Sequence, residues 1–451
     1  MSKTKPVNPP NSEFSIESDI YLFKIAAENP EIKEIIKDYN ERYLYWDEVK
    51  RRPIPKIDKL THESFWKLIR FNRNTRSSDL NISPLPDFKF NYNLTDYIQK
   101  QLHRFDLNLG GVLEGSTTIP DGQGDKYMIS ALMEEAIASS QLEGAATTRK
   151  VAKEMLRSER KPKNESERMI LNNYLTIQEI KKHTQSPLTP ELIKSFHEKI
   201  TNGTLEDSQN EGVFRENDNV NVVDYITGEV YYRPPSNNII NDAILDICDF
   251  ANEEKGNDFI HPILRAITLH FLIGYLHPFV DGNGRTARAL FYWCLLSKGY
   301  WLLEYISISR TILDAPSQYA RAYLCTEQDG NDLTYFFNYN LKVLMKATKD
   351  FRKYVARKAT TKADVYSLQK AKDFNERQIE IILRIHKEKH KAITIKEVQN
   401  TYGIVTQTAR TDLLELQKMG FLESRKMGRK LIFYKTLEFD NLLAKLKNNQ
   451  A

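Results

Sequence analysis

The stretch HPFVDGNGRTAR, His277–Arg288, lies between two apolar segments and decides how the rest of the chain is interpreted. Residues 263–276 before it are strongly apolar, and a helical pattern follows over residues 285–298. The loop is therefore predicted to be a rigidly held turn between two helices. Gly282 and Gly284 permit backbone conformations that are closed to other residues, as a tight turn requires.

The loop carries groups that bind phosphate. Successive N–H groups around Gly282 and Gly284 are expected to form an anion-binding nest at the N-terminus of the second helix, with Asn283 adding a side-chain donor. Arg285 and Arg288 are three residues apart, so both are predicted to project from one face of the first helical turn. Two guanidinium groups beside a glycine nest suit a polyphosphate better than a single carboxylate.

Two further residues of the loop suit catalysis. The imidazole of His277, with an ordinary pKa of about 6.5, can accept a proton near neutral pH. Asp281 is placed to hold Mg²⁺, which shares its ligands with phosphate oxygens. Phe279 is expected to point inward and anchor the loop. Together these groups predict phosphoryl or nucleotidyl transfer. The alternative is a solvated turn with a capping aspartate and two exposed arginines.

The string HPFVDGNGR matches the signature of the Fic family, HPFx(D/E)GNGR, residue for residue, and Arg288 matches the second arginine that follows it. The resemblance covers roughly residues 125–345. It implies the α-helical Fic fold, with ATP and Mg²⁺ as ligands. It also implies transfer of AMP from ATP to a serine, threonine or tyrosine hydroxyl of a target protein.

The resemblance also implies a role for each matching residue. His277 would be the general base and Asp281 the magnesium ligand. The nucleotide would be held by Gly282, Asn283 and Gly284 at the α-phosphate, by Arg285 at a phosphate, and by Arg288 at the γ-phosphate. Gly284 favours AMP transfer, because a lysine there would be typical of the phosphate-transferring, Doc-like branch. Tyr319, in SQYARAYL, resembles loosely a family tyrosine near the adenine; a core aromatic is the alternative.

The segment SSQLEG, Ser139–Gly144, resembles the inhibitory motif (S/T)xxxE(G/N) of the Fic class with an N-terminal inhibitory helix, here expected over residues 127–144. Ser139 would be its first residue and Glu143 its acid. Glu143 is predicted to pair with Arg288 and to occupy the place of the γ-phosphate. The alternative is a helix that ends at Gly144 with a solvated Glu143. A second activity, removal of AMP with Glu143 positioning a water, stays open.

The fold class is predicted to be mainly α. Sparse glycine and proline and a recurring helical period indicate it, with N-terminal helices over 18–40 and 58–75. The expected organisation is an N-terminal helical region, 1–124; a Fic catalytic domain, 125–350; a linker or connecting helix, 351–375; and a winged helix-turn-helix, 376–440.

One segment departs from the helical pattern. Residues 212–235 are rich in β-branched and aromatic residues around a turn at 226–229, which predicts a β-hairpin. This hairpin, 213–233, resembles the family flap over the active site. Its exposed edge is expected to pair with an extended segment of the target protein. An ordinary packed hairpin is the alternative.

The C-terminal region is basic. From residue 351 to the end there are 22 Lys and Arg against 11 Asp and Glu, which indicates an anionic partner, with nucleic acid first. Residues 376–435 are predicted to form three helices and a two-stranded wing, similar to a winged helix-turn-helix. DNA would meet Thr406, Gln407, Thr408 and Arg410 of the third helix and Arg425, Lys426, Arg429 and Lys430 of the wing. The alternative is a winged helix used for dimerisation or packing.

Two other functions compete with protein adenylylation. One is a DNA-binding transcriptional regulator whose Fic domain senses nucleotides. The other is metal-dependent hydrolysis using His261, His270, His277 and Asp281, which is disfavoured because no H-E-x-x-H or comparable ligand set occurs. The oligomeric state, a homodimer included, is left open.

Composition limits the location of the protein. No run of 18 apolar residues occurs, so no membrane span is expected, and the N-terminus lacks an apolar signal core. Cys248, Cys294 and Cys325 form no C-x-x-C pair and are predicted to be reduced, packed thiols of a cytoplasmic protein.

Overall fold

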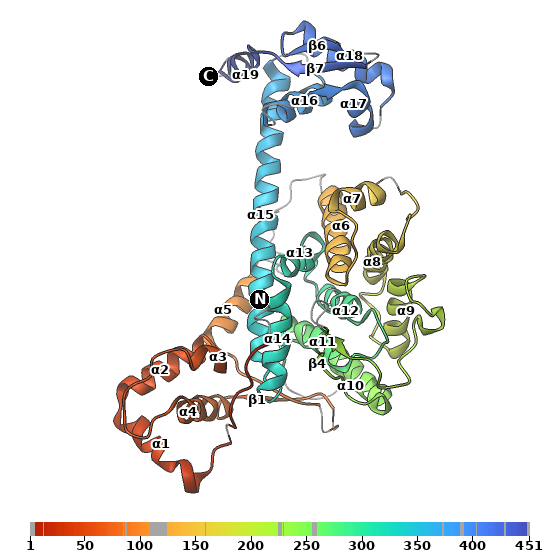
Figure 1. Cartoon of the computed structure of the whole chain (residues 1–451). Helices are drawn as coiled ribbons and strands as arrows, with labels where there is room; N and C mark the ends of the chain where they lie inside the picture. Colours follow the sequence, from red (N-terminus) through yellow and green to blue (C-terminus); the bar gives the residue numbers. More distant parts are fainter. Residues whose placement is uncertain are drawn as a thin grey trace. The chain divides into compact units, whose positions relative to one another are not determined.

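The computed structural model confirms a mainly helical chain with small sheets (Figure 1). Two compact units are present, Met1–Phe351 and Arg352–Ala451, and each is described by itself. The structure describes residues 5–11, 13–83, 85, 88–107, 124–157, 159–223, 228, 230–254, 259–371, 374–387, 392–402, 404–427 and 430–448.

The first unit begins with short helices rather than two long ones. Its elements are α1 (Ile16–Glu28), α2 (Pro30–Glu41), α3 (Trp46–Val49), α4 (His62–Asn74), β1 (Ser78–Asn81), β2 (Lys89–Tyr92) and α5 (Asp96–Phe105). The single helix expected over residues 18–40 is wrong, because Asn29 is extended and Pro30, at the first position of α2, cannot continue the preceding helix. The antiparallel pair β1–β2 was not expected.

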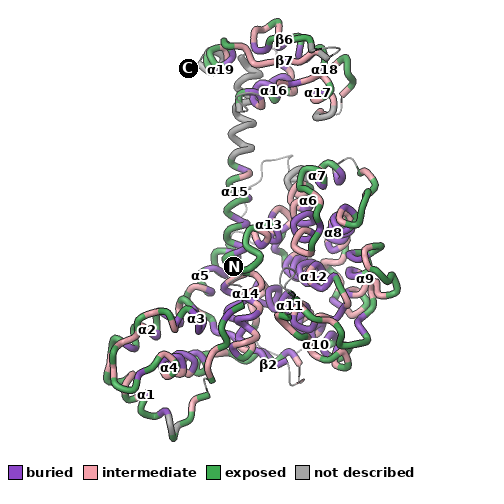
Figure 2. The backbone as a smooth tube through the Cα atoms, viewed as in Figure 1, coloured by how far each residue is buried: buried purple, intermediate pink, exposed green. Residues whose placement is uncertain are grey.

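The rest of the first unit carries the loop His277–Arg288. Its elements are α6 (Gly124–Leu142), α7 (Arg149–Arg157), α8 (Glu165–Lys182), α9 (Pro190–Thr201), η3 (Ser208–Asn210), β3 (Val222–Val223), β4 (Val230–Tyr232), η4 (Asn237–Ile239), α10 (Ile240–Asn252), α11 (Pro262–Leu276), α12 (Asn283–Ser297), η5 (Trp301–Tyr305), α13 (Ile308–Leu313), α14 (Pro316–Gln328) and α15 (Thr334–Ala371). Helices α11 and α12 are buried along nearly their whole length (Figure 2). The loop between them is therefore held at both ends by buried helices.

The sequence also gave predictions for two segments at the edges of this region. Among its described residues, the expected hairpin 213–233 contains the short paired strands β3 and β4, with Val222 opposite Tyr232. Its predicted turn at 226–229 lies mostly outside the described residues. The segment 351–375, expected as a linker or connecting helix, is helical as far as Ala371, where α15 ends.

The second unit has a core of its own, built from buried aliphatic and aromatic side chains. Its elements after α15 are α16 (Glu376–Lys387), β5 (Ile393–Thr394), α17 (Ile395–Tyr402), α18 (Thr406–Lys418), β6 (Leu422–Met427), β7 (Lys430–Lys435) and α19 (Phe439–Asn448). The sheet has the order β5-β7-β6, and β6 and β7 pair antiparallel from Leu422 opposite Lys435 to Met427 opposite Lys430. Strand β5 and helix α19 were not expected, and Arg429 lies outside the described residues.

Two further predictions concern the state of the cysteines and the presence of membrane-spanning helices. Cys248, Cys294 and Cys325 are all buried and free of disulfides, as predicted. In the described part of the chain, none of the helices has the length and apolar character needed to cross a membrane.

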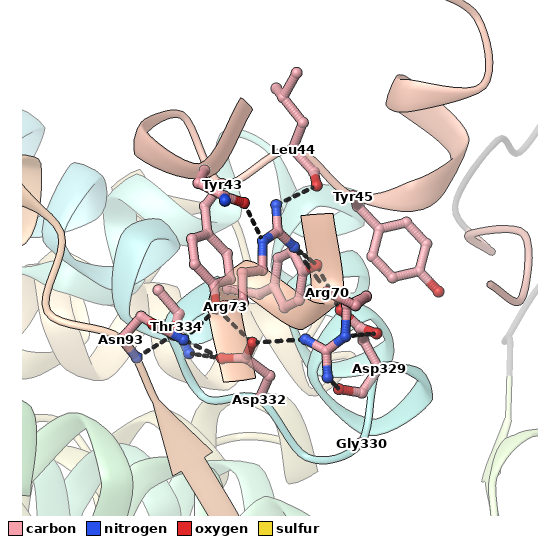
Figure 3. A network of polar contacts seen from close by, with 12 residues as sticks. Tyr43, Leu44, Tyr45, Arg70, Arg73, Asn93, Asp329, Gly330, Asp332 and Thr334 are labelled. Atoms are coloured by element: carbon pink, nitrogen blue, oxygen red, sulfur yellow. Dashed lines mark hydrogen bonds and ion pairs between the residues drawn. The ribbon is translucent and has the colours of Figure 1, made fainter. Parts of the chain in front are cut away.

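A buried arginine joins the N-terminal helices to the start of α15 (Figure 3). Arg73 of α4 is 1% exposed and donates to Asn40 Oδ1 at 2.8 Å, to the Tyr335 hydroxyl at 2.6 Å and to the Leu44 carbonyl at 2.9 Å. Its guanidinium also lies 4.0 Å from the centre of the Tyr43 ring. One side chain thus ties α2, the loop after it and α15 together.

A second arginine completes this network. Arg70 Nε lies 3.2 Å from Asp329 Oδ1, and Arg70 Nη1 lies 3.1 Å from Asp332 Oδ2 (Figure 3). Asp332 is fully buried and also accepts hydrogen bonds from the hydroxyl groups of Tyr43 and Thr334. The carboxylates of Asp329 and Asp332 lie in the turn between α14 and α15. The N-terminal helices therefore brace α14, which lines one side of the site described below.

Arg70→Met tests this brace. Removing Arg70 leaves two buried carboxylates without their nearest cation, which is expected to lower the free energy of unfolding by about 3–5 kcal/mol. Chemical denaturation of the full chain measures the loss. Lys346→Met, which removes an exposed ion pair with Asp314, is the control and should cost at most about 1 kcal/mol. Equal losses for the two variants would contradict the importance of the brace.

Candidate functional site

The backbone of the loop between α11 and α12 adopts left-handed conformations at two points. His277, directly after α11, has φ 49°, and Gly282, directly before α12, has φ 80°. A Cβ atom on Gly282 would lie 2.8 Å from Thr201 Cγ2. Gly282 is therefore required both by its conformation and by the close approach of α9.

The loop is closed on itself by Asn283 and anchored by Phe279. Asn283 Oδ1 accepts from the Phe279 N–H at 2.9 Å, and Asn283 Nδ2 donates to the Phe279 carbonyl at 2.8 Å. The Phe279 ring is fully buried, as expected, and stacks on His197 with ring centres 3.6 Å apart and planes 3° apart. The side chain of Asn283 thus fixes the shape of the loop, and its expected donation to phosphate stays a prediction.

His197 of α9 supports the loop from behind. Its Nδ1 accepts from the Gly212 N–H at 3.0 Å, so its Nε2, 2.8 Å from the Asp281 carbonyl, carries the proton and donates. Burial lowers the pKa of His197 to about 4, so it stays neutral at physiological pH. No sequence motif marks this residue, because a histidine on a buried helix face is ordinary in packed cores.

The imidazole of His277 is oriented by the end of its own helix. His277 Nδ1 lies 3.0 Å from the Gly274 carbonyl, which places the proton on Nδ1 and leaves Nε2 as an acceptor. Burial lowers the pKa of His277, and the bond to Gly274 and the charge of Glu143 act in the opposite direction. A neutral imidazole with a free Nε2 is the form that a general base requires.

Arg215 connects the hairpin segment to the loop and was not singled out in the sequence. Its backbone N–H donates to the Pro278 carbonyl at 2.9 Å, and its Nε donates to the His277 carbonyl at 2.9 Å. The guanidinium also donates to the carbonyls of Asn217, at 2.8 Å, and Pro235. One buried side chain therefore holds both ends of the hairpin segment against the backbone of His277.

A cavity of about 320 Å³ opens beside the loop, a size within the range of small-molecule sites. It is lined by Glu143; by Val220–Val223, Tyr231 and Tyr232 of the hairpin segment; by Gly274, His277, Val280, Asp281, Asn283, Gly284 and Arg288 of α11, the loop and α12; and by Tyr319, Ala320, Tyr323, Leu324 and Glu327 of α14. Residues predicted from the loop, from the inhibitory segment and from the hairpin segment thus meet around one space.

Arg288 is the buried cation of this cavity. Its side chain is 1% exposed, and its Nε donates to Ser139 Oγ at 2.9 Å. Its Nη2 donates to the Ser139 carbonyl at 3.1 Å and to Glu143 Oε1 at 2.7 Å. The predicted pairing of Glu143 with Arg288 is therefore present. Ser139 and Glu143, the two residues predicted from the SSQLEG segment, contact the same guanidinium.

Glu143 also lies against the amino end of α12. A Cβ atom on Gly284 would be 2.3 Å from Glu143 Oε1, so the carboxylate packs directly on the backbone of that residue. The N-cap of α12 is Gly282, which offers no side-chain acceptor to the first N–H groups of the helix. Glu143 thus places negative charge where the helix favours an anion.

Helix α6, which carries Ser139, is held in place by the buried Glu135. Its Oε2 accepts from the Tyr292 hydroxyl at 2.9 Å, from Ser307 Oγ at 2.8 Å and from the Ser309 N–H at 3.0 Å. These donors belong to α12 and to the start of α13. The segment that presents Glu143 is therefore fixed to the helix that presents Arg288.

Arg285 is placed differently from the expectation. Its Nη1 donates to the Ile200 carbonyl at 3.2 Å, and its Nη2 lies 3.7 Å from Asp281 Oδ2. The two arginines therefore do not converge as predicted, because Arg285 reaches toward α9 while Arg288 reaches toward α6. Asp281 itself is exposed, with its side chain 61% accessible beside the cavity.

Tyr319 lines the cavity, and the buried His270 of α11 lies behind it. The Tyr319 hydroxyl lies 2.8 Å from His270 Nε2, and His270 is fully buried. His261 instead bonds to Asp106. Across the described residues, no group of three or more His, Cys, Asp and Glu side chains is arranged to hold a metal ion. The geometry thus gives no support to hydrolysis by a histidine-bound metal.

Comparison with known proteins identifies part of the chain. Residues 187–295 match the family model described as the Fic/DOC family, so this part of the chain is a Fic domain. The protein adenylyltransferase fic-1 of Caenorhabditis elegans is 38% identical over 77 residues, 16% of this chain and 15% of that protein. The protein adenylyltransferase Fic of Drosophila mojavensis is 43% identical over 51 residues, 11% of this chain and 10% of that protein. The matches therefore span only a small part of these relatives.

The solved structures include a similar chain, a Fic family protein from Desulfovibrio desulfuricans G20. It has a TM-score of 0.47 and 16% sequence identity, over 77% of this chain and 98% of that chain. The Fic domain is shown by the family-model match over residues 187–295, and the sequence relatives given above are named protein adenylyltransferases.

Arg215→Lys tests the link between the hairpin segment and the loop. Lysine keeps the charge but loses most of the forked donors, which is expected to speed amide hydrogen exchange of residues 213–223 and 277–280 by on the order of tenfold. Hydrogen exchange read by mass spectrometry measures it. Arg233→Lys, at an exposed position of the same segment, is the control and should leave these peptides unchanged. Unchanged exchange in Arg215→Lys would refute the link.

Proposed function

We propose that the chain is a protein adenylyltransferase that moves AMP from ATP to a hydroxyl group of a target protein, and that Glu143 inhibits it. One observation carries the proposal: a neutral imidazole, the amino end of a helix and a buried guanidinium face one cavity. These are the groups that proton removal and phosphate binding need. The relatives named protein adenylyltransferases support the same reaction.

In this reaction the γ-phosphate binds Arg288, and the α-phosphate lies at the first amides of α12, near Gly284. The target hydroxyl donates its proton to His277 Nε2. The hydroxyl oxygen forms a bond to the α-phosphorus, and the bond from that phosphorus to the bridging oxygen of the β-phosphate breaks. Pyrophosphate leaves, and the target carries AMP.

Asp281 is the residue that would hold Mg²⁺. Its side chain is accessible beside the cavity, and one carboxylate together with nucleotide phosphate oxygens is a donor set that Mg²⁺ commonly uses. When bound, the ion would neutralise charge on the phosphates. The loop would hold this carboxylate in place, because His197 and Asn283 fix the shape of the loop.

The hairpin segment is proposed to receive the target protein. Strands β3 and β4 border the cavity, and the segment is held to the His277 backbone by Arg215. An extended segment of a target that pairs with this hairpin would bring its hydroxyl to His277. Backbone pairing tolerates many sequences, so the choice of target would depend on other contacts.

Glu143 is proposed to compete with the γ-phosphate for Arg288. Arg288 is buried and Glu143 is partly exposed in this ion pair, and the carboxylate also packs on Gly284. A nucleotide can therefore reach its transferring position only when Glu143 gives up the guanidinium. The same carboxylate would be placed to position a water for removal of AMP, a second activity that this geometry leaves open.

Glu143→Gly tests the inhibition. The change frees both the guanidinium of Arg288 and the space at Gly284, so AMP transfer is expected to rise at least about tenfold, since a charged hydrogen bond contributes about 1.5–3 kcal/mol. Incorporation of label from α-phosphate-labelled ATP into protein measures it.

Two controls make the result specific. Gln141→Gly introduces the same flexibility near the end of α6 without touching Arg288, and it should not activate. Adding His277→Ala to Glu143→Gly should abolish labelling. Equal labelling by Glu143→Gly and by the unchanged protein would reject the inhibitory role.

We also propose that the second unit binds DNA, as a winged helix-turn-helix would. Helix α18 exposes Thr406, Gln407 and Arg410 at its amino-terminal part, and β6 exposes Lys426. Arg410 takes part in no ion pair of the described residues, whereas Arg377 and Arg384 are paired with Asp412 and Glu397. An unpaired cation beside exposed hydroxyl and amide groups suits contact with a phosphate backbone.

Duplex binding by the full chain tests this second function. Affinity is expected to fall steeply with salt, and Arg410→Ala should reduce the slope of log K against log salt by about 0.9, the contribution of one phosphate contact. Arg384→Ala, which removes a cation already paired within the unit, is the control and should leave the slope nearly unchanged. Absence of any duplex binding at low salt would rule out the function.

A further inference from the structure

A second cavity, of about 860 Å³, lies along α14 on the face turned away from the loop His277–Arg288. The residues of α14 that line it stand at positions i, i+3, i+4 and i+7 and so share one face of the helix: Gln318, Arg321, Ala322 and Cys325. Tyr319 and Tyr323, on the opposite face, line the cavity at the loop. Helix α14 therefore separates two cavities, and the second also has the size of a small-molecule site.

The other walls of the second cavity come from α15 and from the N-terminal helices. Asn338, Tyr339 and Lys342 project from one face of α15, and Tyr97 belongs to α5. Tyr43–Tyr45, in the segment after α2, form a further wall next to the buried arginines (Figure 3). All these residues belong to the first compact unit, so the second cavity lies within one packed body.

Two polar groups in these walls lack a partner. Asn338 is 9% exposed, and its Oδ1 accepts no hydrogen bond from any described residue. The hydroxyl group of Tyr97 is also buried and likewise has no partner among the described residues. Buried polar atoms are rarely left unpaired, because each one costs free energy. Two such groups in the walls of one ligand-sized cavity point to a ligand that bonds to them.

Five of the six charged side chains that line the second cavity already have partners within the protein. The three cations among the five, Arg42, Arg321 and Lys346, are ion-paired with aspartates. The two carboxylates, Glu41 and Glu48, accept hydrogen bonds from backbone N–H groups at 2.7 Å and 3.3 Å. These five groups hold the walls together, and their charges are largely used by the protein itself.

Lys342 is the sixth charged side chain and differs from the others. It forms no ion pair within the part of the chain that the structure describes, and its side chain is exposed. It stands four residues after Asn338 on α15, so the free ammonium group and the unpaired amide are neighbours on the helix surface. The charge that the cavity offers to a ligand is therefore a single cation beside an amide.

Aromatic rings supply the apolar part of the second cavity. Tyr97 and Tyr339 line it and are only partly buried, so part of each ring is open to a ligand. Aromatic side chains pack favourably against flat rings, face to face with an offset or edge to face. One free cation with two tyrosine rings suits a ligand that has one negative charge and an aromatic ring. A nucleotide is a poorer fit, because its several phosphate charges would meet one free cation.

We propose that the second cavity binds a small aromatic anion. Lys342 holds its acidic group, Asn338 and Tyr97 bond to its polar atoms, and the tyrosine rings pack against its aromatic ring. This binding goes beyond the proposed transfer of AMP and does not depend on it.

A ligand in the second cavity also contacts a neighbour of the cavity at the loop. It lies against α14 on the face opposite Tyr319 and Tyr323. The Tyr339 ring, which it touches, has its centre 6.0 Å from the centre of the Tyr319 ring. The two cavities therefore share a helix and a pair of contacting rings.

Three probes that differ mainly in charge test the proposal: 4-hydroxyphenylacetate, its neutral amide, and the cationic tyramine. Their affinities for the full chain are measured by ligand-detected NMR titration. The anion is expected to bind about fivefold more tightly than the amide, as an ion pair with an exposed lysine allows, and tyramine is expected to bind most weakly. Bound 4-hydroxyphenylacetate should slow amide hydrogen exchange in 96–105 and 334–346, and leave 277–284 unchanged.

Variants assign the contacts. Lys342→Met should abolish the preference for the anion over the amide, whereas Lys349→Met, at an exposed position of α15 outside the cavity, should keep it. Tyr97→Phe removes a hydroxyl group that has no partner in the protein, so it should not lower the free energy of unfolding. It should nevertheless weaken binding of the anion about threefold, because the ligand loses a hydrogen bond. A hydroxyl group with only a structural role would give the opposite pattern.

Several results would overturn the proposal. They are equal affinities for the anion and the amide, failure of all three probes to bind, slowed exchange confined to residues 277–284, and an equal preference for the anion in Lys342→Met and Lys349→Met. The first three use the unchanged protein, so they stand even if a variant folds poorly. None of them bears on the transfer of AMP, which labelling by Glu143→Gly tests separately.

Discussion

A single buried guanidinium, that of Arg288, is the constraint on which the rest of the site depends. It is 1% exposed, and a buried cation of this kind needs an anion beside it. Here that anion is Glu143, delivered by the end of α6 and backed by Ser139. Glu135 fixes α6 to α12 and α13, so the carboxylate arrives in a defined place. If Arg288 receives a phosphate as proposed, this ion pair, which also packs on Gly284, would make the phosphate site a switch.

The loop next to this ion pair is rigid because its supports come from several helices. Phe279 stacks on His197 of α9, and Asn283 closes the loop on itself. Arg215 extends this rigidity to the hairpin segment by holding its two ends against the carbonyl of His277. A target bound at the hairpin would therefore contact an element that is already coupled to the proposed base. Such coupling fits a reaction in which positioning of the hydroxyl matters as much as the proton transfer.

Much of this arrangement could be predicted from the sequence because it is local. The glycines, the helix boundaries and the position of His277 follow from residues next to each other in the chain, and the pairing of Glu143 with Arg288 followed from two recognisable motifs. The placement differs from the expectation where a side chain bonds to the protein's own backbone, whether far away in the sequence or within the loop. Arg285 turns toward Ile200 of α9, and the amide of Asn283 is used by the loop itself.

Other parts of the site carry no local signal at all. His197 and Arg215 act through contacts with residues more than sixty positions away, and neither belongs to a motif considered from the sequence. At the N-terminus, the apolar pattern predicts one continuous helix. Pro30, at the start of α2, divides it into two helices.

The competition for Arg288 is tested most directly by calorimetric binding of Mg·ATP and Mg·AMP to the unchanged protein and to Glu143→Gln. Glutamine keeps the shape of the side chain but removes the charge that holds the guanidinium. If Glu143 and the γ-phosphate share one cation, Mg·ATP should bind about tenfold more tightly to the variant, while Mg·AMP, which has no γ-phosphate, should bind equally to both proteins. Equal changes for the two nucleotides, or no change for either, would contradict the competition.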